Sequence, residues 1–153
     1  MNNLNNYKKT LLIISGGIES VPGIKIAKEM GLKVVVSDGS KNAPGFQFAD
    51  YQLLASTYDK EDTLEKVLYF NKNITKIDGV ICIASDVPLT VAYVANNLKL
   101  PSISIEAAKL ASDKLAMKER FYKDGLPIPW FKKINSLKEI QEIILQEGFP
   151  LVL

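Results

Sequence analysis

Three short, uninterrupted apolar segments are the feature that most limits the folds open to this chain. They are Leu11–Ile14, Val34–Val36 and Val80–Ala84, and each is followed by Ser, Gly or Asp. A strand with one face in water alternates apolar and polar residues, so continuous apolar runs indicate strands buried on both faces. Residues 22–30, between the first two runs, show helical apolar spacing, and Ser20 is predicted to cap this helix. This β-α-β pattern predicts parallel strands joined by right-handed crossovers.

The alternation of strands and helices continues to about residue 100. A loop rich in Gly, Pro and Asn is predicted at Ser40–Ala49, and a short strand follows at Tyr51–Ala55. Helices are predicted after Asp59, which can act as an N-cap, and from the opening sequence Ser85-Asp86-Val87-Pro88. The regular alternation predicts an α/β fold with an open, doubly wound parallel sheet.

The pattern changes beyond Pro101, where two consecutive helices are predicted at Ser104–Ala111 and Ser112–Asp124. The sequence Gly125–Pro129 then breaks the chain and marks a candidate domain boundary.

After this break a strand is predicted at Trp130–Ile134, and Ser136 with Glu139 forms a capping-box pattern at the start of a further helix. A last strand begins at Leu151–Leu153 and does not continue. We therefore expect that the polypeptide was cut inside a domain.

Composition excludes several classes of chemistry. The chain has 153 residues, 19 Lys and Arg against 17 Asp and Glu, no His and one Cys. Without His it cannot form a Ser-His-Asp triad, a Cys-His dyad or a His-ligated metal site, and it shows no acidic cluster suited to a metal. The balanced charges form no basic stripe, so we expect no nucleic-acid partner. Cys82 is predicted to be a buried thiol.

The sequence also suggests where the protein works. It has no signal-peptide pattern at its start and no segment near the ~20 apolar residues that a membrane helix needs. A single Cys excludes an internal disulfide, which suits a reducing compartment. We expect a cytoplasmic protein without a membrane partner.

Gly16 and Gly17 follow the first strand and precede a helix, and Asp38 ends the second strand about 20 residues later. This arrangement suggests a dinucleotide site. However, the glycine pattern is not G-x-G-x-x-G, and Glu19 places a negative charge where a pyrophosphate would lie. The alternatives to a dinucleotide site are a tight turn that needs glycine and a small-ligand site at the carboxyl ends of the strands.

Ser85 and Asp86 end another strand and are expected at the same edge of the sheet. They can act as helix caps or as ligand contacts. In the ligand interpretation, backbone N–H groups after Gly17 would attract an anion, whereas Glu19 and Asp38 would favour an amine or hydroxyl. The candidate substrate-binding residues are Gly16, Gly17, Glu19, Asp38, Ser85 and Asp86.

Three motifs in the second half of the chain resemble a known family. They are Ser112–Lys118 with its Asp113-Lys114 pair, Gly125–Pro129, and Gly148–Leu153. Their order and spacing resemble the ATP-grasp superfamily, in the branch of carbamoyl-phosphate synthase large chains and carboxylate–amine ligases. In that family the last motif normally continues with Lys-Pro.

The resemblance implies a Rossmann-like pre-ATP-grasp domain over residues 1–111. Residues 112–153 would then form a linker helix and the incomplete beginning of an ATP-grasp α+β domain. Such ligases use Mg-ATP to phosphorylate a carboxylate, and an amine attacks the acylphosphate. Lys114 matches the family lysine that reaches an ATP phosphate.

The remaining catalytic and metal-binding residues of the family would follow Leu153. We therefore expect this fragment to be inactive alone. For the full-length protein we expect ATP and Mg²⁺ as cofactors and small carboxylates and amines as substrates. A homodimer is compatible with the family.

Two alternatives stay open. One is a dinucleotide-binding oxidoreductase domain, which rests on the strand–Gly-Gly–helix pattern and Asp38. The other is a non-enzymatic module that binds a small ligand and is complete in 153 residues. Fold-level similarity alone does not choose among these functions.

Overall fold

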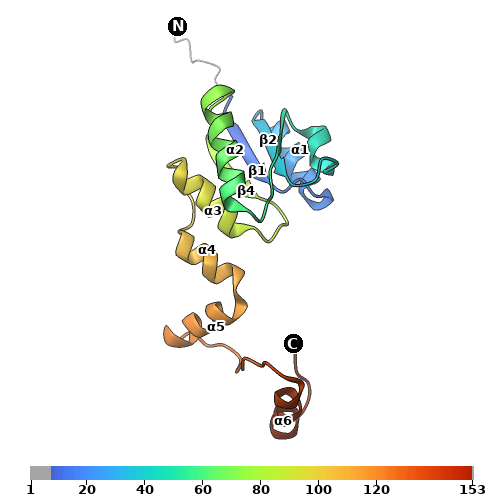
Figure 1. The fold of residues 1–153 in the computed structure, drawn as a ribbon, viewed down its shortest axis with the longest axis vertical. Helices are drawn as coiled ribbons and strands as arrows, with labels where there is room; N and C mark the ends of the chain where they lie inside the picture. The colour runs from blue at the N-terminus through green and yellow to red at the C-terminus, as the bar shows by residue number, and fades with distance from the viewer. Residues whose placement is uncertain (1–7, 153) are drawn as a thin grey trace. The chain divides into compact units, whose positions relative to one another are not determined.

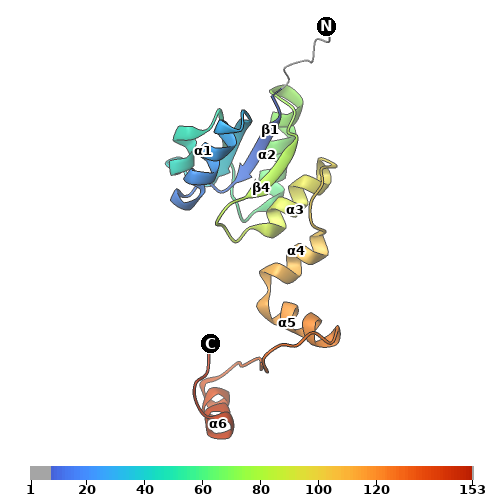
Figure 2. The ribbon, with the colours of Figure 1, turned by 180° about the vertical axis from the view of Figure 1, so that it is seen from behind.

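A computed structural model describes residues 8–152, which form two compact units (Figures 1 and 2). The N-terminal unit ends at Ser112 and the C-terminal unit begins at Asp113. The elements are β1 (Thr10–Ile14), the 3₁₀ helix η1 (Ile18–Ser20), α1 (Val21–Glu29), β2 (Lys33–Asp38), the 3₁₀ helix η2 (Pro44–Phe48), β3 (Tyr51–Leu54), α2 (Lys60–Asn73), β4 (Gly79–Cys82), α3 (Pro88–Asn97), α4 (Ile105–Ser112), α5 (Lys114–Lys123) and α6 (Leu137–Glu147).

The N-terminal unit is built on a four-stranded sheet in the order β3-β2-β1-β4. All three strand pairs are parallel, and Leu12 on β1 lies opposite Val35 on β2 and Val80 on β4. The predicted α/β fold with a parallel sheet is confirmed. The chain winds from β1 to β3 in one direction and then returns to place β4 on the other side of β1. The direction of winding therefore reverses between β1 and β4.

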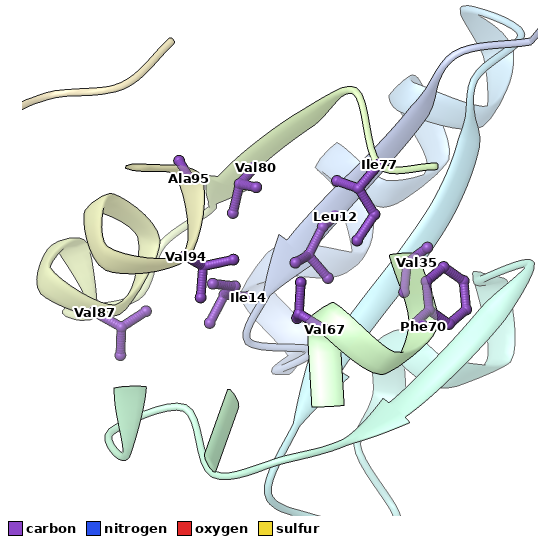
Figure 3. Close-up of a cluster of buried hydrophobic side chains, with 10 residues drawn as sticks. All are labelled: Leu12, Ile14, Val35, Val67, Phe70, Ile77, Val80, Val87, Val94 and Ala95. Atoms are coloured by element: carbon purple, nitrogen blue, oxygen red, sulfur yellow. The ribbon is translucent and has the colours of Figure 1, made fainter. Parts of the chain in front are cut away.

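Both faces of the central strands β1 and β2 are covered, which is why these strands are continuously apolar. The outer strand β4 differs from the prediction, because Ile81 in the third apolar run is 38% exposed. On one face, α1 and η2 pack on the sheet; on the other, α2 and α3 do so, and Figure 3 shows the side chains of this second core. Alternate residues of β1 serve the two cores. The first core contains Ile13, Ile24, Ala27, Val34, Val36, Ala43 and Phe46, and the second contains Leu12, Ile14, Val35, Val67, Phe70, Ile77, Val80, Val87, Val94 and Ala95.

Side-chain caps begin several helices where the sequence predicted them. The Asp59 carboxylate accepts a hydrogen bond from the Asp62 N–H at 2.9 Å and caps α2. Ser136 accepts from the Glu139 N–H at 3.3 Å and caps α6, while the Glu139 carboxylate accepts from the Asn135 N–H at 2.8 Å. Both predicted caps are therefore confirmed.

Two predicted strands are absent from the described part of the C-terminal unit. Trp130–Ile134 is irregular chain, and so are Leu151 and Val152, whereas Leu153 lies outside the described residues. A short apolar run becomes a strand only when a neighbouring strand binds its backbone groups. The four strands among residues 8–152 all belong to the N-terminal unit. The predicted loop Ser40–Ala49 also contains η2, which begins at Pro44.

Within residues 8–152, no helix is both long enough and apolar enough to cross a bilayer.

Asp50 connects the start of β2 to α1. Its carboxylate accepts hydrogen bonds from the Val34 N–H at 2.7 Å and from the Lys28 ammonium. Burial on its own would raise the pKa of Asp50, but these two hydrogen bonds and the Lys28 charge hold that pKa below its ordinary value. The ionised carboxylate therefore contributes to stability.

We expect Asp50→Asn to lower the free energy of unfolding at pH 7 by about 1–3 kcal/mol, because a charged hydrogen-bond acceptor is lost. Since the folded-state pKa lies below the unfolded one, this stabilisation is complete above the unfolded pKa and disappears as pH falls through the folded pKa. Urea unfolding at several pH values should show a smaller acid-induced loss of stability in the variant. Glu65→Gln, at an exposed position of α2, is the control. An unchanged slope in Asp50→Asn would refute this role.

Candidate functional site

Six of the seven predicted site residues lie along one edge of the sheet. Gly16, Gly17 and Glu19 follow β1, Asp38 is the last residue of β2, and Ser85 and Asp86 follow β4. This edge is formed by the carboxyl ends of parallel strands, and the winding reverses there between β1 and β4. Open α/β sheets bind ligands at this kind of position. The ligand contacts of the six residues themselves stay predictions.

Asp38 ties the ends of β1 and β2 together. Its Oδ2 accepts a hydrogen bond from the Gly16 N–H at 2.8 Å, and its Oδ1 accepts from the Ser40 N–H at 2.8 Å. Both carboxylate oxygens therefore have backbone partners. This arrangement gives Asp38 a clear structural role at the edge, whether or not it also contacts a ligand.

Gly16 is required by close packing rather than by an unusual backbone angle. A Cβ atom on Gly16 would lie 2.7 Å from Cγ1 of Val36 and 3.3 Å from Cβ of Ala43. The Gly16 carbonyl also accepts a hydrogen bond from the Gly45 N–H at 2.8 Å. At Gly17 the nearest atom to such a Cβ would be Oε2 of Glu19, at 3.3 Å, which is the end of a flexible side chain. Only the first glycine is thus fixed by the fold.

The loops after β1 and β4 are joined by one side chain. The Ser20 hydroxyl donates a hydrogen bond to the Ile83 carbonyl at 2.8 Å. The sequence predicted Ser20 as the cap of α1, and this is wrong because its side chain makes no cap hydrogen bond. Gly23 permits the approach, since a Cβ there would lie 2.5 Å from Cδ1 of Ile83. The contact holds the two loops at the switch point together.

Two residues without the freedom of glycine have positive φ angles in these same loops. They are Ser15, at 81°, and Ala84, at 51°. Such conformations cost free energy in L-residues and persist only when surrounding contacts impose them. The Ser15 N–H donates to the Ser37 carbonyl at 2.8 Å, which is one such contact. Sequence reasoning missed both residues, because neither type signals a left-handed conformation.

Ser85 and Asp86 do not cap α3. This helix begins at Pro88, and the preceding Val87 provides no side-chain cap. The cap interpretation of Ser85 and Asp86 is therefore wrong, whereas a ligand role for them is compatible with the half-buried Ser85 and the exposed Asp86.

The neighbouring thiol of Cys82 is half-buried and lies 3.6 Å from the Ser85 carbonyl oxygen. Burial raises its pKa, which disfavours the thiolate needed for nucleophilic attack. The prediction of a buried thiol is therefore met only in part, because Cys82 is half-buried.

The edge between β1 and β4 is acidic. The segments 15–20 and 83–88, which flank the switch point, contain Glu19 and Asp86 and no Lys or Arg. Both acidic residues are exposed. Backbone N–H groups at the start of η1 can attract an anion, but the carboxylates disfavour a ligand with several negative charges. The arrangement suits a ligand that carries an amine or a hydroxyl group.

Lys114 lies in the C-terminal unit as the first residue of α5. Asp113 caps this helix through hydrogen bonds from the Leu115 and Ala116 N–H groups, both at 3.0 Å. The Lys114 side chain is exposed and has no salt-bridge partner among the described residues. It is free to meet an anionic group, and its phosphate role stays a prediction.

In the part of the chain that the structure describes, no group of three or more Cys, Asp or Glu side chains could hold a metal ion.

The sequence analysis missed a concave surface in the C-terminal unit. This groove has a volume of about 330 Å³ and is mainly apolar, with two lysines. It is lined by Lys118, Trp130, Phe131, Lys132, Ile134, Ile140, Ile143, Leu151 and Val152. The available signal was a high density of large apolar residues in a short segment with few partners.

Substituting Gly16 tests whether packing alone fixes this residue. We expect Gly16→Ala to lower the free energy of unfolding by about 1–3 kcal/mol, because the added methyl group overpacks against Val36. Gly39→Ala is a matched control, since its Cβ would meet the nearest atom at an ordinary 3.7 Å. Thermal and urea unfolding measure both. Equal stability of the two variants would contradict the packing argument.

No model of a known protein family matches the chain. It is 27% identical over 152 residues to the N5-carboxyaminoimidazole ribonucleotide synthase of Staphylococcus haemolyticus, covering 98% of this chain and 39% of that protein. It is 24% identical over 165 residues to the carbamoyl phosphate synthase large chain of Methanosarcina barkeri, covering 96% of this chain and 15% of that protein. The chain thus spans less than half the length of these relatives.

Solved structures of related synthetases also match this chain over part of their length. The phosphoribosylglycinamide synthetase of Anaerococcus prevotii superposes with a TM-score of 0.72 at 23% identity, over 94% of this chain and 36% of that one, which shows a shared fold. An ADP complex of an N5-carboxyaminoimidazole ribonucleotide synthetase superposes with a TM-score of 0.67 at 25% identity, over 93% of this chain and 36% of that one.

Proposed function

We propose that this chain forms the substrate-binding part of an ATP-dependent ligase. The premise is that its relatives are ATP-grasp enzymes, which the chain matches over their N-terminal part. The ligase would phosphorylate a carboxylate with ATP, and an amine would then attack the acylphosphate. The relatives are carboxylate–amine ligases, and this similarity over nearly the whole chain is the observation that carries the proposal.

The carboxyl edge between β1 and β4 would hold part of the substrate. Its backbone N–H groups after Gly17 would bind a carboxylate, whereas Glu19 and Asp86 would bind an amine or hydroxyl on the same molecule. The Ser20–Ile83 hydrogen bond supports this role, because it fixes the spacing of the two loops without using the exposed carboxylates.

Lys114 would bind a phosphate oxygen of ATP as a point charge. Its exposed ammonium and lack of a salt-bridge partner among residues 8–152 support this assignment. Bound ATP would supply the phosphoryl group that activates the carboxylate. Because the chain spans only 39% and 15% of the two relatives, we expect the 153-residue chain to be unable to complete this reaction alone.

The dinucleotide alternative has weaker support in the structure. Its acidic residue, Asp38, would need a carboxylate oxygen directed at a ribose hydroxyl. Both oxygens of Asp38 instead accept backbone hydrogen bonds at 2.8 Å. Glu19 also remains beside the turn where a pyrophosphate would bind.

Lys114→Ala tests the phosphate role in the longest polypeptide that the gene encodes. We expect kcat/KM for ATP to fall about 10²- to 10³-fold, as when a preorganised group facing developing charge is removed. ADP release in the presence of substrate gives the rate. Lys123→Ala, an exposed lysine in the last turn of the same helix, is the control and should change the rate less than twofold. Equal rates for both variants would remove Lys114 from the site.

Glu19→Gln tests the substrate side of the proposal. We expect weaker binding of amine-bearing carboxylates by about tenfold, because a charge-assisted hydrogen bond becomes neutral. Analogues without the amine should bind the variant and the parent protein alike. Isothermal calorimetry with matched substrate pairs measures this difference, and Glu29→Gln, an exposed acid at the far end of α1, is the control. A uniform loss for both kinds of substrate would contradict a specific amine contact.

A further inference from the structure

Ser15 holds a backbone conformation that costs a serine free energy. It is the first residue after β1, and its φ angle is 81°. In this left-handed region an L side chain crowds the backbone, whereas glycine, which has no Cβ, does not. The chain has glycines at the next two positions, Gly16 and Gly17, but not at this one. A side chain retained against such strain at a candidate site calls for a role.

Hydrogen bonds within the fold do not explain the Ser15 side chain. The Ser15 N–H donates to the Ser37 carbonyl at 2.8 Å, but the N–H of a glycine would do the same. Ser15 is half-buried, and its hydroxyl has no hydrogen-bond partner among residues 8–152. By contrast, the Ser20 hydroxyl, which follows in the same loop, donates to the Ile83 carbonyl at 2.8 Å. The Ser15 hydroxyl is therefore available to a group that binds from outside.

The Ser15 hydroxyl and the Glu19 carboxylate border the same small space beside Gly17. A Cβ atom on Gly17 would lie 3.9 Å from Oγ of Ser15 and 3.3 Å from Oε2 of Glu19. Apart from the glycine and its two chain neighbours, the described chain places no other heavy atom within 4 Å of that point. Glu19 is exposed and has no salt-bridge partner among the described residues. One small group in this space can contact both oxygens.

The two oxygens favour a group that donates hydrogen bonds. An ionised carboxylate only accepts hydrogen bonds, and the oxygen of a hydroxyl accepts them as well. The Glu19 charge repels an anion, whereas an ammonium group carries the opposite charge and has protons for both oxygens. We propose that Ser15 and Glu19 together bind an amine on the carboxylate substrate, and that Ser15 sets the preference for an amine at this position. This rests on the proposed function, which leaves the choice between an amine and a hydroxyl open.

Unfolding measurements test whether the Ser15 side chain serves the fold. In the longest polypeptide that the gene encodes, Ser15→Gly should raise the urea midpoint of unfolding, whereas Ser15→Ala, which keeps the Cβ atom, should leave it unchanged. Lys99→Gly is the matched control, because Lys99 is exposed after α3 with a φ angle of 57°, and this variant should also be stabilised. An unchanged or lower midpoint for Ser15→Gly would overturn the proposal, because the serine side chain would then stabilise the fold itself.

Substrate selectivity tests the amine contact. ADP release by the same polypeptide is measured with small amino acids, each matched with acids that carry a hydroxyl or a hydrogen in place of the amine, such as alanine, lactate and propionate. The ratio of kcat/KM for the amino acid to kcat/KM for the unsubstituted acid should fall about tenfold in Ser15→Ala and in Ser15→Gly, because a hydrogen bond to a charged group is lost. Lys99→Gly should leave this ratio unchanged. An unchanged ratio in the Ser15 variants would overturn the proposal, and so would a parent protein that prefers the acids without an amine.

The two measurements separate this inference from the proposed function. Absence of ADP release with every carboxylate would refute the proposed function, and this inference with it. ADP release with a selectivity that does not depend on Ser15 would refute this inference alone. The proposal predicts that Ser15→Gly gains stability and loses selectivity together, whereas removal of a side chain that served only the fold would lower stability.

Discussion

Burial of β1 on both faces is the constraint on which the rest of the N-terminal unit depends. Leu12 and Ile14 pack toward α2 and α3, while Ile13 packs toward α1, and all three are fully buried. A strand in this position needs a parallel neighbour on each side and a helical layer on each face. The placement of β2 and β4 on its two sides then fixes where the winding reverses. The candidate site is a consequence of how this central strand is buried.

The edge at that reversal is assembled by contacts that do not involve a ligand. Asp38 holds the ends of β1 and β2, Ser20 joins the loops after β1 and β4, and Gly16 allows η2 to pack closely. These contacts leave Glu19 and Asp86 exposed on a fixed frame. Binding groups on a preorganised frame lose little conformational freedom on binding, which favours recognition of a small molecule.

Sequence patterns correctly predicted those features that depend on interactions between residues close together in the chain. The apolar runs indicated the strands, Asp59 and Ser136 were correctly predicted as caps, and the motifs around Lys114 pointed to the superfamily to which the relatives belong. Predictions failed where a distant partner decides the outcome. Ser20 binds Ile83 rather than its own helix, and Trp130–Ile134 has no neighbouring strand in the described chain. Residue type and spacing carry no information about such partners, and the same holds for the positive φ of Ser15 and Ala84.

Transfer of oxygen from substrate to phosphate tests the central claim most directly. The longest polypeptide that the gene encodes is incubated with ATP, an amine and a panel of carboxylates labelled with ¹⁸O. If a carboxylate oxygen attacks the γ-phosphorus and the amine then attacks the acyl carbon and displaces phosphate, each phosphate released carries one ¹⁸O atom from the carboxylate. Mass spectrometry of the phosphate should show this label for the true substrate. Phosphate released during ligation without the label would contradict carboxylate activation by ATP.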